Sequence, residues 1–167
     1  SINQPSKEIN VLTRSEQDIL CQYLYNHQSE RNQGILLSLF TGLRIGELCA
    51  LEWNDISLES GTIYVHQNIQ RIQTKESSAK KTKVVITTPK SQCSIRTIPI
   101  PEFIISMLKS ANIEHKGYLL TGNKRYLEPR TMENHFHKIL NEISIRQVNF
   151  HTLRHTFATR CIEVGFD

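Results

Sequence analysis

The chain has 167 residues, of which 38% are hydrophobic and 22% charged, and a formal net charge of +4 at pH 7. This length is enough for one domain with a hydrophobic core and too short for two. The longest apolar runs, such as residues 35–40, fall far below the roughly 20 residues that a membrane-spanning helix needs, and no signal peptide pattern opens the sequence. We therefore expect a single domain, residues 1–167, in the cytoplasm.

The four cysteines are widely separated, at Cys21, Cys49, Cys93 and Cys161, and include no C-x-x-C pair. A zinc site needs clustered ligands, so this spacing argues against a bound metal. Free thiols are typical of proteins in a reducing cytoplasm, and we expect all four cysteines to be free.

The positive charge is concentrated between residues 71 and 96. This segment contains seven basic residues and one acidic residue, whereas the rest of the chain has more acidic than basic residues. Such a segment is often a solvated surface loop, but clustered lysine and arginine also bind nucleic acid phosphates by releasing counterions. If the segment faces double-stranded DNA, the expected contact residues are Arg71, Lys80, Lys81, Lys83 and Arg96.

The first part of the chain has the pattern of three helices. Thr13 and Glu16 form a capping-box pattern that predicts the start of the first helix. A second helix is expected after Ser29 and should end at Gly42, because glycine is the usual helix terminator. A short third helix is expected within residues 43–53.

The apolar period then changes from helical to alternating. Three β-like runs, rich in valine, isoleucine and threonine, are expected as strands at 62–72, 83–90 and 94–101. Helical patterns return in three segments, the second of them opened by Pro129, at 102–110, 130–143 and 151–165. The predicted fold class is α+β, mainly α: a helical domain with a small three-stranded antiparallel sheet in its first half.

Two stretches before the last helix carry residues suited to phosphate chemistry, and each also has an ordinary explanation. Arg44 and Glu47 have the spacing of a surface ion pair on a helix. However, a guanidinium directly after a turn is well placed to bind two phosphate oxygens. Lys90 lies where two β-like runs meet, near an expected hairpin tip, where a lysine commonly serves solubility. An ammonium there could also act as a general acid if neighbouring cations lower its pKa.

The last helix is expected to have a polar and an apolar face. His151, Arg154 and His155 share the polar face, whereas the apolar stripe is expected at Leu153, Phe157, Cys161 and Val164. An H-x-x-R pattern alone is weak, because histidines at the start of a buried helix are commonly structural. His135 and His137 fall on different faces of their helix, and we expect both to be structural or surface residues.

The three stretches together, in the order R-x-G-E, lysine and H-x-L-R-H, resemble the catalytic domain of the tyrosine recombinases, the phage-type integrases. The resemblance runs from about Val11 onwards and is strongest over residues 41–56 and 150–159. It implies a site-specific DNA recombinase or integrase of a bacterial or phage mobile genetic element, which cuts and rejoins DNA through a 3′-phosphotyrosine.

The resemblance also implies a role for each motif residue. Arg44 and Arg154 would bind the two non-bridging oxygens of the scissile phosphate. Lys90 would protonate the departing 5′-hydroxyl as general acid, and His151 would assist proton transfer from the nucleophile. Glu47 would orient the basic residues, and His155 would pack at the back of the site. Because the arginines and the lysine supply the charge, no metal or other cofactor is expected.

The sequence departs from the family pattern in its tyrosines. The pattern continues after H-x-L-R-H with a histidine or tryptophan and then the nucleophilic tyrosine, but all five tyrosines precede that motif. We therefore expect a monomeric catalytic-domain fragment that lacks cleavage activity, the N-terminal DNA-binding domains and the C-terminal segment. The full-length parent is expected to act as a tetramer on double-stranded DNA.

Two alternatives to this interpretation stay open. The first is a naturally truncated module that binds DNA or other integrase protomers without cleaving. The second is an enzyme of the type IB topoisomerase kind, which shares the phosphate-binding residues.

Overall fold

A computed structural model describes residues 10–73, 82–88, 94–110 and 114–165. The first helix, α1 (Arg14–Asn26), begins at the expected capping box. The Thr13 hydroxyl accepts the Glu16 N–H at 3.0 Å, and the Glu16 carboxylate accepts the Thr13 N–H at 2.9 Å. These two bonds satisfy backbone donors that a helix start leaves unpaired, which confirms the prediction.

The next two helices are also confirmed, and the turn between them is short. Helix α2 (Glu30–Thr41) begins at Ser29, whose hydroxyl accepts the Asn32 N–H at 3.1 Å. It ends at Gly42, which adopts the left-handed conformation with φ of 77°. Helix α3 (Ile45–Ala50) follows at once and is continued by the 3₁₀ turn η2 (Trp53–Asp55).

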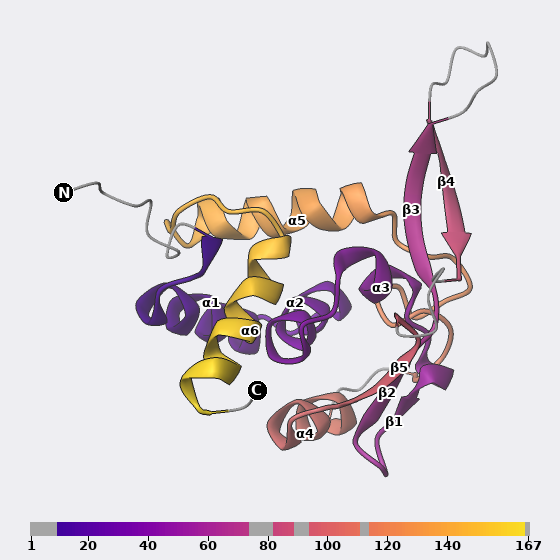
Figure 1. The fold of residues 1–167 in the computed structure, drawn as a ribbon, viewed down its shortest axis with the longest axis horizontal. Helices are drawn as coiled ribbons and strands as arrows, with labels where there is room; N and C mark the ends of the chain where they lie inside the picture. The colour runs from indigo at the N-terminus through magenta and orange to yellow at the C-terminus, as the bar shows by residue number, and fades with distance from the viewer. Residues whose placement is uncertain (1–9, 74–81, 89–93, 111–113, 166–167) are drawn as a thin grey trace.

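The strands form two separate antiparallel sheets. Strand β1 (Ile56–Ser57) pairs with β2 (Thr62–Val65), which pairs with β5 (Arg96–Pro99). Strands β3 (Asn68–Gln73) and β4 (Thr82–Thr87) pair only with each other among the described strands. Figure 1 shows this second pair extending away from the helices. The small three-stranded sheet in a mainly helical domain is therefore confirmed.

Two details of the strand prediction are wrong. The run 62–72 is not one strand, because it divides into β2 and β3, which pair with different partners. The runs flanking Lys90 do not form a hairpin with each other, since β4 pairs with β3 and β5 pairs with β2. Alternation along one segment reports which residues face the core, but it does not report the pairing partner.

Three more helices complete the domain, and they agree with the predicted segments: α4 (Glu102–Ser110), α5 (Pro129–Glu142) and α6 (His151–Glu163). Helices α1, α2 and α6 pack together, with α6 crossing α2 (Figure 1). The core between the helices is rich in leucine and includes the fully buried Phe136 and Phe150. This packing fixes the start of α6 close to the end of α2.

The expected apolar stripe of α6 is only partly correct. Leu153 is fully buried, but Val164 is 69% exposed, and the other residues that α6 buries are Thr152 and Thr156. The Thr156 hydroxyl donates to the Thr152 carbonyl oxygen at 2.7 Å and accepts the Leu12 N–H at 3.0 Å. Because its hydrogen bonds are satisfied, this threonine can occupy a core position that a hydrophobicity pattern reserves for apolar residues.

Candidate active site

The turn between α2 and α3 places Arg44 at the N-cap of α3. Gly42 reverses the chain, and Leu43 is buried, so Arg44 follows in extended conformation with φ of −73° and ψ of 153°. The Arg44 side chain is 52% exposed. The expected place of Arg44 directly after a turn is confirmed, one position before the first helical residue, and its role in binding phosphate stays a prediction.

Glu47 connects this turn to the three-stranded sheet. Its carboxylate accepts the Arg44 backbone N–H at 3.0 Å, and two hydrogen bonds of 2.8 and 3.0 Å come from Arg96 of β5. Burial alone would raise the pKa of Glu47, but the bonds from Arg96 and Arg44 outweigh it and hold the pKa below its ordinary value. Glu47 is therefore an ionised carboxylate, although it is only 5% exposed.

Helix α6 brings its motif residues to the same turn. The Arg154 guanidinium donates to the Gly42 carbonyl oxygen at 2.6 Å, so residues 112 positions apart are joined directly. His151 lies one helical turn earlier, and its ring contacts the ring of His155 edge to face. His155 is exposed and contacts the His151 ring, so it is not packed behind the site as expected.

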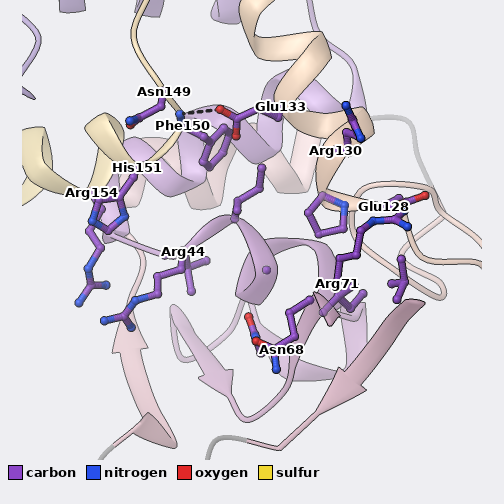
Figure 2. Close-up of a pocket in the computed structure, with 17 residues that line it drawn as sticks. Arg44, Asn68, Arg71, Glu128, Arg130, Glu133, Asn149, Phe150, His151 and Arg154 are labelled. Atoms are coloured by element: carbon purple, nitrogen blue, oxygen red, sulfur yellow. Dashed lines mark hydrogen bonds and ion pairs between the residues drawn. The ribbon is translucent and has the colours of Figure 1, made fainter. Parts of the chain in front are cut away.

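The side chains of Arg44, His151 and Arg154 line one cavity of about 510 Å³. Its walls come from the start of α3, strand β3, the start of α5 and the start of α6. Figure 2 shows Arg44, His151 and Arg154 along one side of this cavity, while Arg71, Glu128 and Arg130 lie on the other. Three of the four predicted catalytic residues therefore meet in one place. The fourth, Lys90, lies outside the described residues.

The Arg44 side of the cavity is strongly cationic. Partial burial lowers the pKa of Arg154, and the nearby charges of Arg44 and Arg96 lower it further, against an opposing effect of Glu47. Partial burial also lowers the pKa of His151, as do His155 and Arg154. Groups whose pKa is lowered by neighbouring cations lie in a positive potential. This side of the cavity can bind an oxyanion through two guanidinium groups.

The residues predicted to contact DNA differ in their surroundings. Lys83 is exposed on β4, whereas Lys80 and Lys81 lie outside the described residues. Arg71 forms an ion pair with Glu128 and donates to the Thr82 hydroxyl at 3.1 Å. Arg96 is bound to Glu47. The contact of these residues with DNA stays a prediction.

The sequence prediction missed two residues that fix the start of α6. The Asn149 side-chain oxygen accepts the Thr152 N–H at 3.1 Å, and the Glu133 carboxylate accepts the Phe150 N–H at 3.2 Å. Both residues line the cavity. An asparagine three positions before Thr152 is a recognisable helix-start signal. The contribution of Glu133 depends on α5 lying beside Phe150, which no local pattern indicates.

Within the described parts of the chain, no group of three or more potential metal ligands lies together. Among those same residues, no helix is long and apolar enough to cross a membrane. His135 and His137 make hydrogen bonds to Asn32 and Gln147, both at 2.8 Å, as expected for structural residues.

Comparison with known proteins shows the family of the chain. The model of the phage integrase family matches residues 10–167. The chain is 35% identical over 150 residues to a tyrosine recombinase XerC-like protein of Caldanaerobacter subterraneus subsp. tengcongensis, covering 78% of this chain and 38% of the relative. It is 32% identical to the tyrosine recombinase XerA of Pyrococcus furiosus, covering 82% of this chain and 43% of the relative. The chain belongs to the phage integrase family.

A solved structure shares the fold of the chain. The Tn1549 transposon integrase, solved in complex with transposon right end DNA, superposes with a TM-score of 0.70 at 20% identity, over 94% of this chain and 54% of that chain. The helical domain with its small sheet is therefore the tyrosine recombinase catalytic fold. The chain spans less than half the length of the two relatives described above.

Proposed function

We propose that this chain forms the phosphate-binding part of a site-specific DNA recombinase of a mobile genetic element. The full-length protein would cut and rejoin DNA strands through a 3′-phosphotyrosine. The observation that carries this proposal is the meeting of Arg44, His151 and Arg154 in one cavity. Family membership supports it, and one neighbour in fold is a transposon integrase in complex with the DNA end of its transposon.

In this proposal the two arginines stabilise the transition state. Arg44 and Arg154 each donate to a non-bridging oxygen of the scissile phosphate, where negative charge increases as the nucleophile attacks. Preorganised donors are effective because they need no rearrangement during the reaction. The bond from Arg154 to the Gly42 carbonyl oxygen supports this role, since it holds the guanidinium before DNA arrives.

His151 and Lys90 are proposed to transfer protons. The lowered pKa of His151 favours the neutral ring near pH 7, and a neutral imidazole can accept the proton of the attacking hydroxyl. Lys90 would then protonate the 5′-hydroxyl that leaves. Two guanidinium groups and one ammonium would supply the positive charge, so the proposed mechanism includes no metal.

The nucleophile is proposed to come from outside these 167 residues. The five tyrosines are Tyr23, Tyr25, Tyr64, Tyr118 and Tyr126, and none of them lines the cavity. We therefore propose that the chain by itself binds DNA without cleaving it. Other parts of the full-length protein would contribute the tyrosine, further DNA contacts and the contacts between the four protomers of an active tetramer.

The meeting of Arg44, His151 and Arg154 in one cavity also favours a second candidate function. This is a module that binds DNA or integrase protomers and never cleaves. A nicked suicide substrate, which traps the covalent intermediate, separates the two candidates when it is applied to the natural full-length protein. Trapping by the full-length protein supports the recombinase. Trapping by the 167-residue chain alone would mean that one of its own tyrosines is the nucleophile and that the assignment above is wrong.

The roles of the two arginines are tested in the full-length protein by single-turnover cleavage and by DNA affinity. We expect Arg44→Ala or Arg154→Ala to lower the cleavage rate by about 100-fold or more, with a much smaller loss of affinity. Arg125→Ala, an exposed arginine outside the cavity, removes the same charge and serves as control. Equal losses of cleavage and affinity would show that Arg44 and Arg154 only anchor the duplex.

A further inference from the structure

Glu47 places a negative charge beside the arginines proposed to bind the phosphate. Its carboxylate is buried, with 5% exposure, and one of its oxygens lies 4.0 Å from a guanidinium nitrogen of Arg44. A carboxylate at this place competes with a phosphate for the same guanidinium, because both anions suit its planar donor pairs. The position of Glu47 therefore decides how much of Arg44 is available to a ligand.

Arg96 occupies both oxygens of this carboxylate. One of its terminal nitrogens donates to Glu47 Oε2 at 2.8 Å and the other donates to Oε1 at 3.0 Å, which is a two-point pairing. Oε1 also accepts the Arg44 backbone N–H. At 4.0 Å, the separation between the Arg44 guanidinium and Oε2 is longer than a hydrogen bond.

Arg96 is itself fixed by its surroundings. It belongs to β5, where it pairs with Val65 of β2, and its guanidinium also donates to the Ser94 carbonyl oxygen at 2.9 Å. Its side chain is 26% exposed. The hydrogen bonds with Glu47 raise the pKa of Arg96 above its ordinary value. A guanidinium held in this way has few donors left for a DNA phosphate.

We propose that Arg96 is a positioning residue: it holds the Glu47 carboxylate in place and leaves the Arg44 guanidinium free to bind the phosphate. This inference rests on the proposed function and changes the role predicted for Arg96 from a DNA contact to a support of Arg44. Without Arg96, the buried carboxylate still lies close to the two arginines proposed to bind the phosphate: Arg44, at 4.0 Å, and Arg154, whose pKa it raises. The ion pair between Arg44 and Glu47 then shortens and occupies the donors that the phosphate needs.

The test compares Arg96→Gln with the double variant Arg96→Gln/Glu47→Gln in the natural full-length protein. Single-turnover cleavage of a nicked suicide substrate is measured together with DNA affinity over a range of salt concentrations. We expect Arg96→Gln to lower the cleavage rate by roughly tenfold or more, as for coupled neighbours in one network. The double variant should recover most of this loss, since its competing carboxylate is absent. In the double variant, the affinity and its salt dependence should stay close to those of the unmodified protein, because Arg44 is again available to the phosphate.

Other results would overturn the proposal. If Arg96 contacts DNA directly, both variants lose affinity, and the salt slope falls by about 0.9 for the lost phosphate contact. If Arg96 only stabilises the fold, the loss of cleavage in Arg96→Gln follows its fraction of unfolded protein, and the folded fraction cleaves at the unmodified rate. Cleavage by Arg96→Gln at the unmodified rate would also contradict the proposal.

Two further variants complete the design. Arg96→Lys keeps the positive charge but not the two-point pairing with Glu47. This variant replaces Arg96→Gln in the test if Arg96→Gln fails to fold. It should melt near the unmodified protein and cleave more slowly, and unmodified cleavage by this variant would overturn the proposal. Arg44→Ala is measured in parallel. If it cleaves normally, the proposed function fails; if it is inactive and Arg96→Gln is normal, only the role of Arg96 fails.

Discussion

At the scale of single residues, Gly42 serves both the backbone and the site. Its positive φ ends α2, and its carbonyl oxygen holds Arg154. A Cβ at this position would lie 2.6 Å from the ring of Phe157, so the space beside the turn is already filled. The backbone conformation and the packing against Phe157 both require the smallest residue here. The glycine before Arg44 therefore belongs to the site as much as the arginine does.

The pKa of Glu47 leads to a prediction about stability and pH. Because the folded protein holds this pKa below the ordinary value of 4.5, ionised Glu47 stabilises the fold above pH 4.5. The contribution is lost as the pH falls through the lower folded pKa. We expect the free energy of unfolding of Glu47→Gln to lie below that of the unmodified chain at neutral pH.

The same difference should shrink as the pH falls below 4.5, and urea unfolding on both sides of that pH measures it. The comparison isolates Glu47, because Glu16, whose pKa is also lowered, is present in both proteins. A difference that is independent of pH would mean that Glu47 is not held ionised by Arg96 and Arg44.

At the scale of secondary structure, local signals predicted helix ends better than strand partners. Thr13, Ser29, Gly42 and Pro129 each mark a helix boundary in the structure. These signals work because a cap acts within one turn of its own residue. The prediction of one strand over residues 62–72 was wrong because the pairing of a strand depends on residues outside its own segment. The two halves of this segment have the same alternation, but β2 pairs with β1 and β5, whereas β3 pairs with β4.

The packing of α3 against β3 leads to a prediction for Gly46. A Cβ at this position would lie 2.6 Å from the Ile69 carbonyl oxygen and would also overlap the Asn68 side chain. Alanine is favoured over glycine in helices by about 1 kcal/mol, but overlap with a backbone atom is more costly. We expect Gly46→Ala to lower the free energy of unfolding by about 1–3 kcal/mol, measured by urea unfolding.

A second substitution identifies the cause. Asn68→Ala in the Gly46→Ala background removes the side-chain overlap but leaves the Ile69 carbonyl oxygen in place. Stability should therefore recover only in part. If Gly46→Ala alone stabilises the chain, helix propensity decides the outcome and the close approach of α3 to β3 is not needed.

At the scale of the whole molecule, the site joins segments that are far apart in the sequence. The order of the motifs predicted that Arg44, His151 and Arg154 act together, and the structure places all three around one cavity. The pairing of Arg96 with Glu47 was not predicted. This pairing requires β5 to join β2 in one sheet and α3 to pack on β3. No spacing within a single segment encodes such a contact.

The concentration of charge between residues 71 and 96 leads to the last prediction. If this segment faces DNA, binding releases counterions, and log K falls linearly with log salt with a slope of about −0.9 for each phosphate neutralised. We expect the replacement of Lys80, Lys81 and Lys83 by glutamate to flatten this slope. A matched control reverses three exposed lysines outside the cavity and outside this segment, Lys109, Lys116 and Lys124. Both variants lower the formal net charge by six from +4, so equal slopes would show that net charge alone attracts DNA and that the segment is ordinary surface.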